Sequence, residues 1–191
     1  KIPIHPKELG IDFLSASAHK FHGPKGVGFF YASSADFDSY LHGGDQEQKK
    51  RAGTENLAAI VGMVSALKED LNDQVEHYQK LSALKATFLE EIADLDYYLN
   101  ESNHQLPYVV NIGFPGQKND LLLLRLDLEG ISISTGSACT AGIVQTSHVL
   151  EAFYGPDSPR LKESVRISLS PLNTEEELKQ LAQTLKNIIG D

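Results

Sequence analysis

The spacing of hydrophobic residues divides the chain into two kinds of element. Short apolar runs bounded by glycine, proline and polar residues predict strands. These runs lie at residues 9–18, 27–32, 108–114, 131–134 and 164–169. Longer segments with an apolar residue at every third or fourth position predict helices. These segments lie at residues 55–70, 71–95, 119–129 and 147–153, and in a last segment that begins at Thr174. This order of strands and helices is typical of a mixed α/β protein.

The first two predicted strands enclose the polar sequence HKFHGPKG. They therefore predict a hairpin-like pair that carries polar groups at its tip, and a polar, glycine-bearing loop follows at residues 42–56. Two strands cannot bury both of their faces, so this first part indicates an incomplete sheet. The later part has three predicted strands and covering helices. We expect a domain boundary between them, with residues 1–65 in one domain and residues 66–191 in the other.

Two predicted helices carry recognisable end signals. Gly130 follows the helix at 119–129 and is suited to a C-cap. Thr174 and Glu177 have the spacing of a capping box at the start of the last helix. The face that this last helix should bury consists of Leu178, Leu181, Leu185 and Ile188.

Composition and charge narrow the class of protein. Hydrophobic residues make up 41% of the 191 residues, which is too many for a chain that is mainly disordered. The single cysteine, Cys139, excludes an intrachain disulfide scaffold, and no apolar run is long enough to span a membrane. The net charge is −9, so we expect no direct nucleic-acid partner. The lone thiol indicates a reducing compartment, and we expect a cytoplasmic protein.

Lys20 is the first residue that could carry chemistry. It lies in Ser17-Ala18-His19-Lys20, directly after a predicted buried strand. An exposed lysine at a strand end is the commoner situation. A lysine that is partly desolvated can instead lose its proton and form a Schiff base with a carbonyl compound. Ser17 and His19 would then offer polar contacts beside it that suit a phosphate.

Cys139 is the second candidate. Its neighbours in the sequence are Ser, Thr, Gly and Ala, whereas a structural cysteine usually has apolar neighbours. An accessible thiol on a loop suits a nucleophile. From this local context alone, a reactive thiol and an incidental surface thiol are equally favoured.

Arg166 is the third candidate. It lies inside the apolar strand SVRISL, and burial of an unpaired guanidinium is costly. We therefore expect it to face a carboxylate, which is either a structural Asp or Glu or the carboxylate of a small acid substrate.

Other chemical motifs are missing from the sequence. GPKGVG lacks the spacing of a P-loop, and neither C-x-x-C nor G-x-S-x-G is present. His19 and His22 have no third ligand nearby in the sequence, so we expect no metal site.

Taken together, four segments resemble the cysteine desulfurases, which belong to the class V branch of the fold-type I enzymes that use pyridoxal phosphate (PLP). The matching segments, in chain order, are SASAHKFHGPKGVGFFY (15–31), GGDQEQKKRAGTEN (43–56), STGSACTAG (134–142) and SVRISL (164–169). STGSACTAG resembles the long-loop, NifS/IscS-like subgroup. The resemblance implies the C-terminal part of a PLP-dependent transferase fold. It would comprise the end of the large-domain sheet and a small α/β domain with a short, largely antiparallel sheet covered by helices.

The resemblance also implies a role for each matching residue. Lys20 matches the lysine that forms the Schiff base with the cofactor, and Ser17 and His19 match residues that hold its phosphate. Thr54 matches a threonine that reaches the phosphate in the neighbouring subunit, which implies a homodimer. Two further matches complete the site, the carboxylate-binding arginine at Arg166 and the sulfur-accepting nucleophile at Cys139.

The implied activity is the removal of sulfur from L-cysteine. Alanine leaves and a persulfide remains on the cysteine nucleophile. A sulfur-acceptor protein, either an iron–sulfur scaffold or a tRNA-thiolation enzyme, then takes the sulfur.

The sequence departs from the family in two respects. The aspartate that pairs with the cofactor's ring nitrogen and the histidine that stacks on the ring lie further upstream of the lysine than this sequence reaches, and Asp12 is too close to Lys20 to be that aspartate. We therefore expect a C-terminal portion that is a poor enzyme alone. Within the second segment, Asp45, Gln48 and Lys49 also differ from the usual residues.

Two other functions remain open. Another class V PLP enzyme, such as an aminotransferase, would need Lys20 but not Cys139. A cofactor-free sulfur-relay or docking fragment would need Cys139 but not Lys20. An exposed sheet edge would in either case favour pairing with another chain.

Overall fold

The computed structural model describes residues 1–102, 104–136 and 146–190. The chain divides into two compact units, Lys1–Glu76 and His77–Asp191, which are described separately below. The boundary between the two units follows Glu76, whereas the sequence predicts a boundary after residue 65. The difference arises because the whole of the first long helix belongs to the first unit. The identification of these units with the two domains of a transferase stays a prediction.

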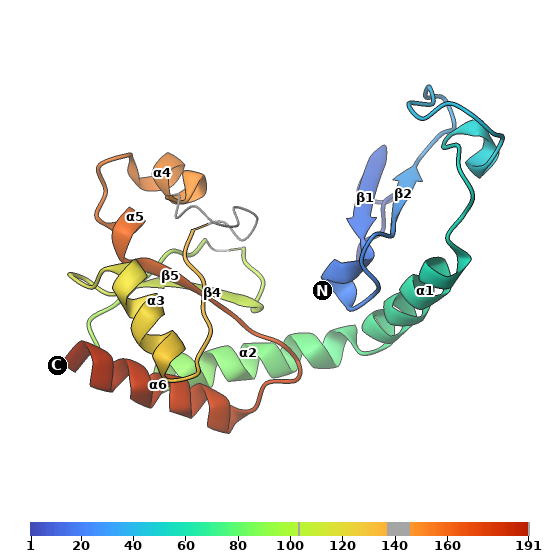
Figure 1. Ribbon diagram of the computed structural model, residues 1–191. Helices are drawn as coiled ribbons and strands as arrows, with labels where there is room; N and C mark the ends of the chain where they lie inside the picture. The colour runs from blue at the N-terminus through green and yellow to red at the C-terminus, as the bar shows by residue number, and fades with distance from the viewer. Residues whose placement is uncertain (103, 137–145, 191) are drawn as a thin grey trace. The chain divides into compact units, whose positions relative to one another are not determined.

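The first unit is built on an antiparallel hairpin. Strand β1 (Phe13–Ser17) pairs with β2 (Gly28–Ala32), and the 3-10 turn η1 (Ala18–Phe21) lies between them, as predicted (Figure 1). The prediction that the first strand is buried is wrong, because Phe13 of β1 is 54% exposed; on β2, Phe30 is 56% exposed. These two rings stack on each other across the strands with centroids 5.7 Å apart, which shelters only part of their apolar surface.

A loop and a helix complete the first unit. The loop contains the short 3-10 turn η2 (Glu47–Lys49), and α1 (Leu57–Asn72) follows. The side chain of Asn56 caps α1 by accepting a hydrogen bond from the backbone N–H of Ala59 at 3.2 Å. Helix α1 packs against η1 and buries Met63. The helix therefore supports the turn that carries Lys20.

The second unit contains a three-stranded antiparallel sheet in the order β3-β4-β5. Its strands are β3 (Tyr98–Leu99), β4 (Val109–Gly113) and β5 (Ser164–Ser168). Its helices are α2 (Gln74–Glu91), which begins in the first unit, α3 (Asn119–Leu128), α4 (His148–Tyr154), α5 (Arg160–Glu163) and α6 (Glu175–Gly190). These elements confirm the mixed α/β fold with short antiparallel sheets and covering helices.

The core of the second unit lies on one face of this sheet. Alternate residues of β4 and β5 point into it, and helices α2, α3 and α6 supply the facing side chains. The largest of the completely or almost completely buried side chains are Leu81, Phe88, Ile92, Val110, Ile112, Phe114, Leu122, Leu126, Val165 and Leu185. In Figure 1, α2 and α6 run below the sheet and α4 lies above it. The residues between the core positions of β4 and β5 therefore face the α4 side.

The predicted end signals of two helices are confirmed. The N–H of Gly130, whose φ is +76°, donates to Asp127, and the N–H of Ile131 donates to the carbonyl of Leu126 at 2.9 Å, which forms a Schellman motif. At α6, the N–H of Glu177 donates to the Thr174 hydroxyl at 3.2 Å, and the Glu177 carboxylate accepts from the N–H of Thr174 at 3.0 Å.

The predicted strand at 131–134 is wrong. Ile131 and Ile133 pack against the core, but only Ser134 pairs with a neighbouring strand, through a bridge to Arg166. Strand β3 and helix α5 were not predicted, because each has too few residues to show a period.

Candidate functional site

The turn that carries Lys20 is fixed by its backbone. The N–H of Ala18 donates to Val27 at 3.0 Å, and the N–H of Gly23 donates back to Ala18 at 2.9 Å. Ala18 is completely buried, whereas its neighbours Ser17 and His19 are exposed. The turn therefore holds its one small apolar side chain inside and presents its polar side chains to solvent.

Ser17, His19 and Lys20 are brought together on this turn. All three are exposed, and within the described part of the chain none of their side chains has a hydrogen-bond or ion-pair partner. An amine, a hydroxyl and an imidazole held this close in sequence suit an aldehyde-bearing phosphate ester such as PLP. The described residues of the first unit do not by themselves supply the desolvation that a Schiff-base lysine needs.

Thr54 lies in the polar loop of the same unit and is exposed. The loop is closed by the Gln46 side chain, which accepts a hydrogen bond from the N–H of Gly53 at 3.0 Å. Residues Glu47, Gln48 and Lys49 all have positive φ, between 51° and 64°. Such a conformation is unusual for residues other than glycine. Two of the three positions that depart from the family pattern therefore lie in a strained turn near Thr54.

Asp12 is exposed and makes a side-chain hydrogen bond within the first unit. Its Oδ1 accepts a hydrogen bond from the hydroxyl of Ser33, which directly follows β2, at 3.2 Å. Cys139 lies outside the described residues.

Arg166 lies in the middle of β5 and is half-buried. Its backbone makes two hydrogen bonds with Ser134, at 2.7 and 3.1 Å, and its Nε donates to the Ser134 hydroxyl at 3.1 Å. Within the described ranges no Asp or Glu pairs with Arg166. Of the two partners expected from the sequence, the structural carboxylate is therefore absent there, and the Nη groups of Arg166 are left for another ligand.

A pocket of about 370 Å³ opens beside Arg166. Its polar wall comes from the sheet and the segment after β3, and its apolar wall comes from α4. The polar residues include Asn100, Glu101, Ser102, Asn111 and His148, and the apolar ones are Val149, Leu150 and Phe153.

A hydrogen-bonded network extends behind the polar wall. Asn100 Nδ2 donates to Asn111 Oδ1 at 2.9 Å and to the Ser164 hydroxyl at 2.8 Å, and its Oδ1 accepts from Arg160 Nη1 at 2.9 Å. The Arg160 guanidinium lies over the Tyr98 ring, 4.0 Å from its centroid. Sequence reasoning missed these residues. The one signal available in the sequence was the presence of polar residues among the apolar positions of the strands.

Tyr98 is held at the edge of this network. Its hydroxyl donates to Glu163 Oε2 at 3.0 Å, and Glu163 Oε1 accepts from the N–H of Gly116 at 2.9 Å. Burial raises the pKa of Tyr98 to about 12, and the neighbouring Glu163 carboxylate adds to the shift. Tyr98 is therefore a neutral hydrogen-bond donor at physiological pH.

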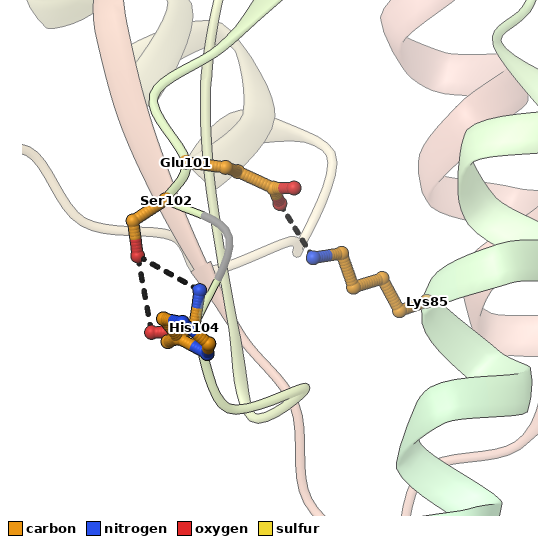
Figure 2. Close-up of polar contacts among 4 residues, drawn as sticks. All are labelled: Lys85, Glu101, Ser102 and His104. Atoms are coloured by element: carbon orange, nitrogen blue, oxygen red, sulfur yellow. Dashed lines mark hydrogen bonds and ion pairs between the residues drawn. The ribbon is translucent and has the colours of Figure 1, made fainter.

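Glu101, an acidic residue that lines the pocket, is already paired. Figure 2 shows Glu101 in an ion pair with Lys85 of α2, and Ser102 in hydrogen bonds with the backbone of His104. The Lys85 side chain is only 14% exposed, so this pair is partly shielded from water. The ion pair offsets the negative charge that Glu101 would otherwise add to the pocket.

The described ranges also bear on metal binding and on membrane insertion. They contain no group of three His, Cys, Asp or Glu side chains that could hold a metal ion. None of the helices described is long and apolar enough to cross a membrane.

Comparison with known proteins gives a consistent set of relatives. The model of the family described as aminotransferase class-V matches residues 1–181. The chain is 43% identical to a "Putative cysteine desulfurase IscS 1" of Bacillus subtilis, over 98% of this chain and 51% of that protein. It is 40% identical to a "Cysteine desulfurase IscS" of Dictyoglomus turgidum, over 98% of this chain and 48% of that protein.

Solved structures agree with the sequence relatives. A NifS-like protein superposes with a TM-score of 0.86 at 31% identity, covering 99% of this chain and 49% of the other. A NifS-like protein from Rickettsia africae gives a TM-score of 0.85 at 30% identity, covering 100% and 51%. The chain therefore spans about half the length of the proteins that it matches.

Proposed function

Because the chain belongs to the aminotransferase class-V family, we propose that it carries the lysine, cysteine and carboxylate-binding residues of a PLP-dependent cysteine desulfurase. The substrate would be L-cysteine, and the products would be L-alanine and a persulfide on Cys139. The observation that carries the proposal is the pairing of Ser134 with Arg166. It fastens the chain, a few residues before Cys139, to the arginine proposed to bind the substrate's carboxylate.

Each proposed residue has a defined task. Lys20 would bind the cofactor covalently and move the α-proton of the substrate through its Nζ, and Ser17 and His19 would bind the phosphate. The cofactor, when bound, supplies an electron sink for the bond-breaking steps. The Cys139 thiolate would attack the substrate's sulfur. As the S–C bond breaks, its electron pair stays on carbon, so alanine is released and the sulfur remains on Cys139.

The finer features of the proposal rest on the resemblance to cysteine desulfurases. Thr54 would contribute to the cofactor site of a second subunit in a homodimer. A cytoplasmic sulfur-acceptor protein, an iron–sulfur scaffold or a tRNA-thiolation enzyme, would collect the persulfide. The aspartate that pairs with the cofactor's ring nitrogen in the family has no match in this sequence, because Asp12 is too close to Lys20 to be that aspartate. We therefore expect the 191-residue chain to turn over L-cysteine poorly by itself.

The decisive experiment compares Cys139→Ala with Lys20→Ala in the native protein supplied with PLP and L-cysteine. A desulfurase loses persulfide and alanine formation in both variants. An aminotransferase keeps its activity in Cys139→Ala, and a cofactor-free sulfur relay accepts sulfur from a persulfide donor in Lys20→Ala. Either of the last two results would overturn the proposal.

A further inference from the structure

We propose that Asn111 is a second donor to the substrate's α-carboxylate, beside Arg166, and that Arg160 and Asn100 are the positioning residues that orient its amide. The identity of the substrate rests on the proposed function, whereas the carboxylate site itself rests on the geometry of the second unit.

Asn111 and Arg166 are neighbours on adjacent strands of the sheet. They are directly opposed in the antiparallel register of β4 and β5, so their side chains project from the same face. The flanking residues Val110, Ile112 and Val165 are buried in the core on the other face. Asn111 and Arg166 both line the pocket.

The orientation of the Asn111 amide follows from the network behind it. A guanidinium can only donate hydrogen bonds, so the atom of Asn100 that meets Arg160 must be its carbonyl oxygen. Asn100 therefore presents its NH₂ group to Asn111, and the atom of Asn111 that meets it must be the oxygen. The NH₂ group of Asn111 is therefore left without a partner in this network. The direction of this chain of hydrogen bonds is set by one cation at its start.

Arg160 is well placed to set that direction. Its guanidinium lies between two aromatic rings, 4.0 Å from the centroid of Tyr98 and 4.4 Å from that of Tyr154. Stacking of this kind restrains a guanidinium that would otherwise sample many rotamers. Tyr98 is itself held by its hydrogen bond to Glu163.

Free donors on this face of the sheet are suited to an anion. Within the described part of the chain, Asn111 Nδ2 has no partner, and Arg166 uses only its Nε, toward Ser134. The terminal Nη groups of Arg166 therefore remain for an end-on contact with a carboxylate, and Asn111 offers a further N–H on the same face. Glu101, the acidic residue that lines the pocket, is paired with Lys85, as Figure 2 shows. The arrangement is suited to the carboxylate of a small amino acid.

The test is a titration of the ¹⁵N-labelled 191-residue chain, without PLP, by L-cysteine under reducing conditions. Cysteamine, which lacks only the carboxylate, is titrated in parallel. We expect the side-chain resonances of Asn111 Nδ2 and Arg166 Nε to shift with L-cysteine and to stay in place with cysteamine. Asn111→Asp, which turns the donor into an acceptor of similar shape, should weaken binding roughly 10-fold or more.

A matched control separates the local effect from the added charge. Asn187 is exposed on α6, so Asn187→Asp adds the same charge elsewhere and should leave the affinity unchanged. Shifts at Arg166 with none at Asn111, or equal affinity in Asn111→Asp, would overturn the role of Asn111. Shifts at neither residue would overturn the carboxylate site. Because no turnover is needed, both results are distinct from a failure of the desulfurase proposal, which the Cys139→Ala comparison tests.

The positioning role of Arg160 has its own readout. Arg160→Leu removes the donor that orients Asn100, so we expect weaker L-cysteine binding and a changed Asn111 side-chain resonance before any ligand is added. Arg160→Lys keeps a cationic donor and should restore much of the affinity. If both variants bind L-cysteine like the parent chain, Arg160 does not orient the amide.

Discussion

Replacement of Gly113 by alanine should destabilise the second unit. It pairs directly with Tyr98 in the register of β3 and β4, and the Tyr98 ring covers its Cα. A Cβ built at Gly113 would overlap the Cζ, Cε2 and hydroxyl atoms of that ring. Gly113→Ala therefore forces the ring to move. Most Gly→Ala changes in a strand are instead stabilising, because alanine loses less conformational entropy on folding than glycine does.

The expected cost can be worked from two contributions. Overpacking of this kind costs about 1–3 kcal/mol. Displacement of the ring also breaks the hydrogen bond from Tyr98 to Glu163, which is worth about 1 kcal/mol. A loss of about 3 kcal/mol corresponds to a change of roughly 100-fold in an opening equilibrium. The Arg160 stack on Tyr98 would loosen with it.

Native-state hydrogen exchange of the β4 amides measures this loss in the second unit alone. The matched control is a double-mutant cycle with Tyr98→Ala, which removes the ring that the new methyl group meets. In that background, Gly113→Ala should be neutral or stabilising by up to about 1 kcal/mol. Equal costs of Gly113→Ala in both backgrounds would refute the contact argument.

Three further predictions concern the same unit. Thr174→Ala removes the capping bond to the N–H of Glu177 and should cost about 1 kcal/mol in urea unfolding, with Thr174→Ser close to the parent; no loss would contradict the capping box. Leu185 is 1% exposed, so Leu185→Ala should cost about 2–5 kcal/mol, and a smaller loss would contradict a close-packed core. Because the pKa of Tyr98 is raised from 10.0 to about 12, the unfolded chain loses this proton first, and the free energy of unfolding should fall as pH rises from 10 to 12. Tyr98→Phe should flatten that fall, and parallel pH profiles would show that Tyr98 does not titrate as described.

Local signals predicted those elements whose formation depends on neighbours in the sequence. The helix α6 follows from its capping pair and from a four-residue apolar stripe, and all of these positions behave as expected. The hairpin around Lys20 follows from two apolar runs and a glycine-bearing turn.

Features that depend on distant partners were not accessible in this way. The alternation in 131–134 is that of a strand, but within the described residues only Ser134 pairs with a strand, through Arg166 of β5, whereas Ile131 and Ile133 pack against the core. The two-residue strand β3 pairs Tyr98 with Gly113, which leaves room for the ring, and no local pattern reveals this pairing.

The candidate site contains both residues that a local motif reveals and residues that depend on distant partners. Lys20, Ser17 and His19 are neighbours in the sequence, so a motif was sufficient to find them. The partners of Arg166 were not predictable, since Asn111 and Ser134 reach it only through the sheet and the bridge. Arg160 is further removed, because it acts through Asn100.

The most direct test of the central proposal is to identify which residue holds the cofactor. The native protein is incubated with PLP, reduced with borohydride and mapped by peptide mass spectrometry, with Lys20→Arg as the control. We predict one pyridoxyl adduct, on Lys20, that is lost in the control. Adducts spread over exposed lysines such as Lys25 and Lys49, or an unchanged pattern in Lys20→Arg, would contradict the proposed role of Lys20 and with it the desulfurase assignment.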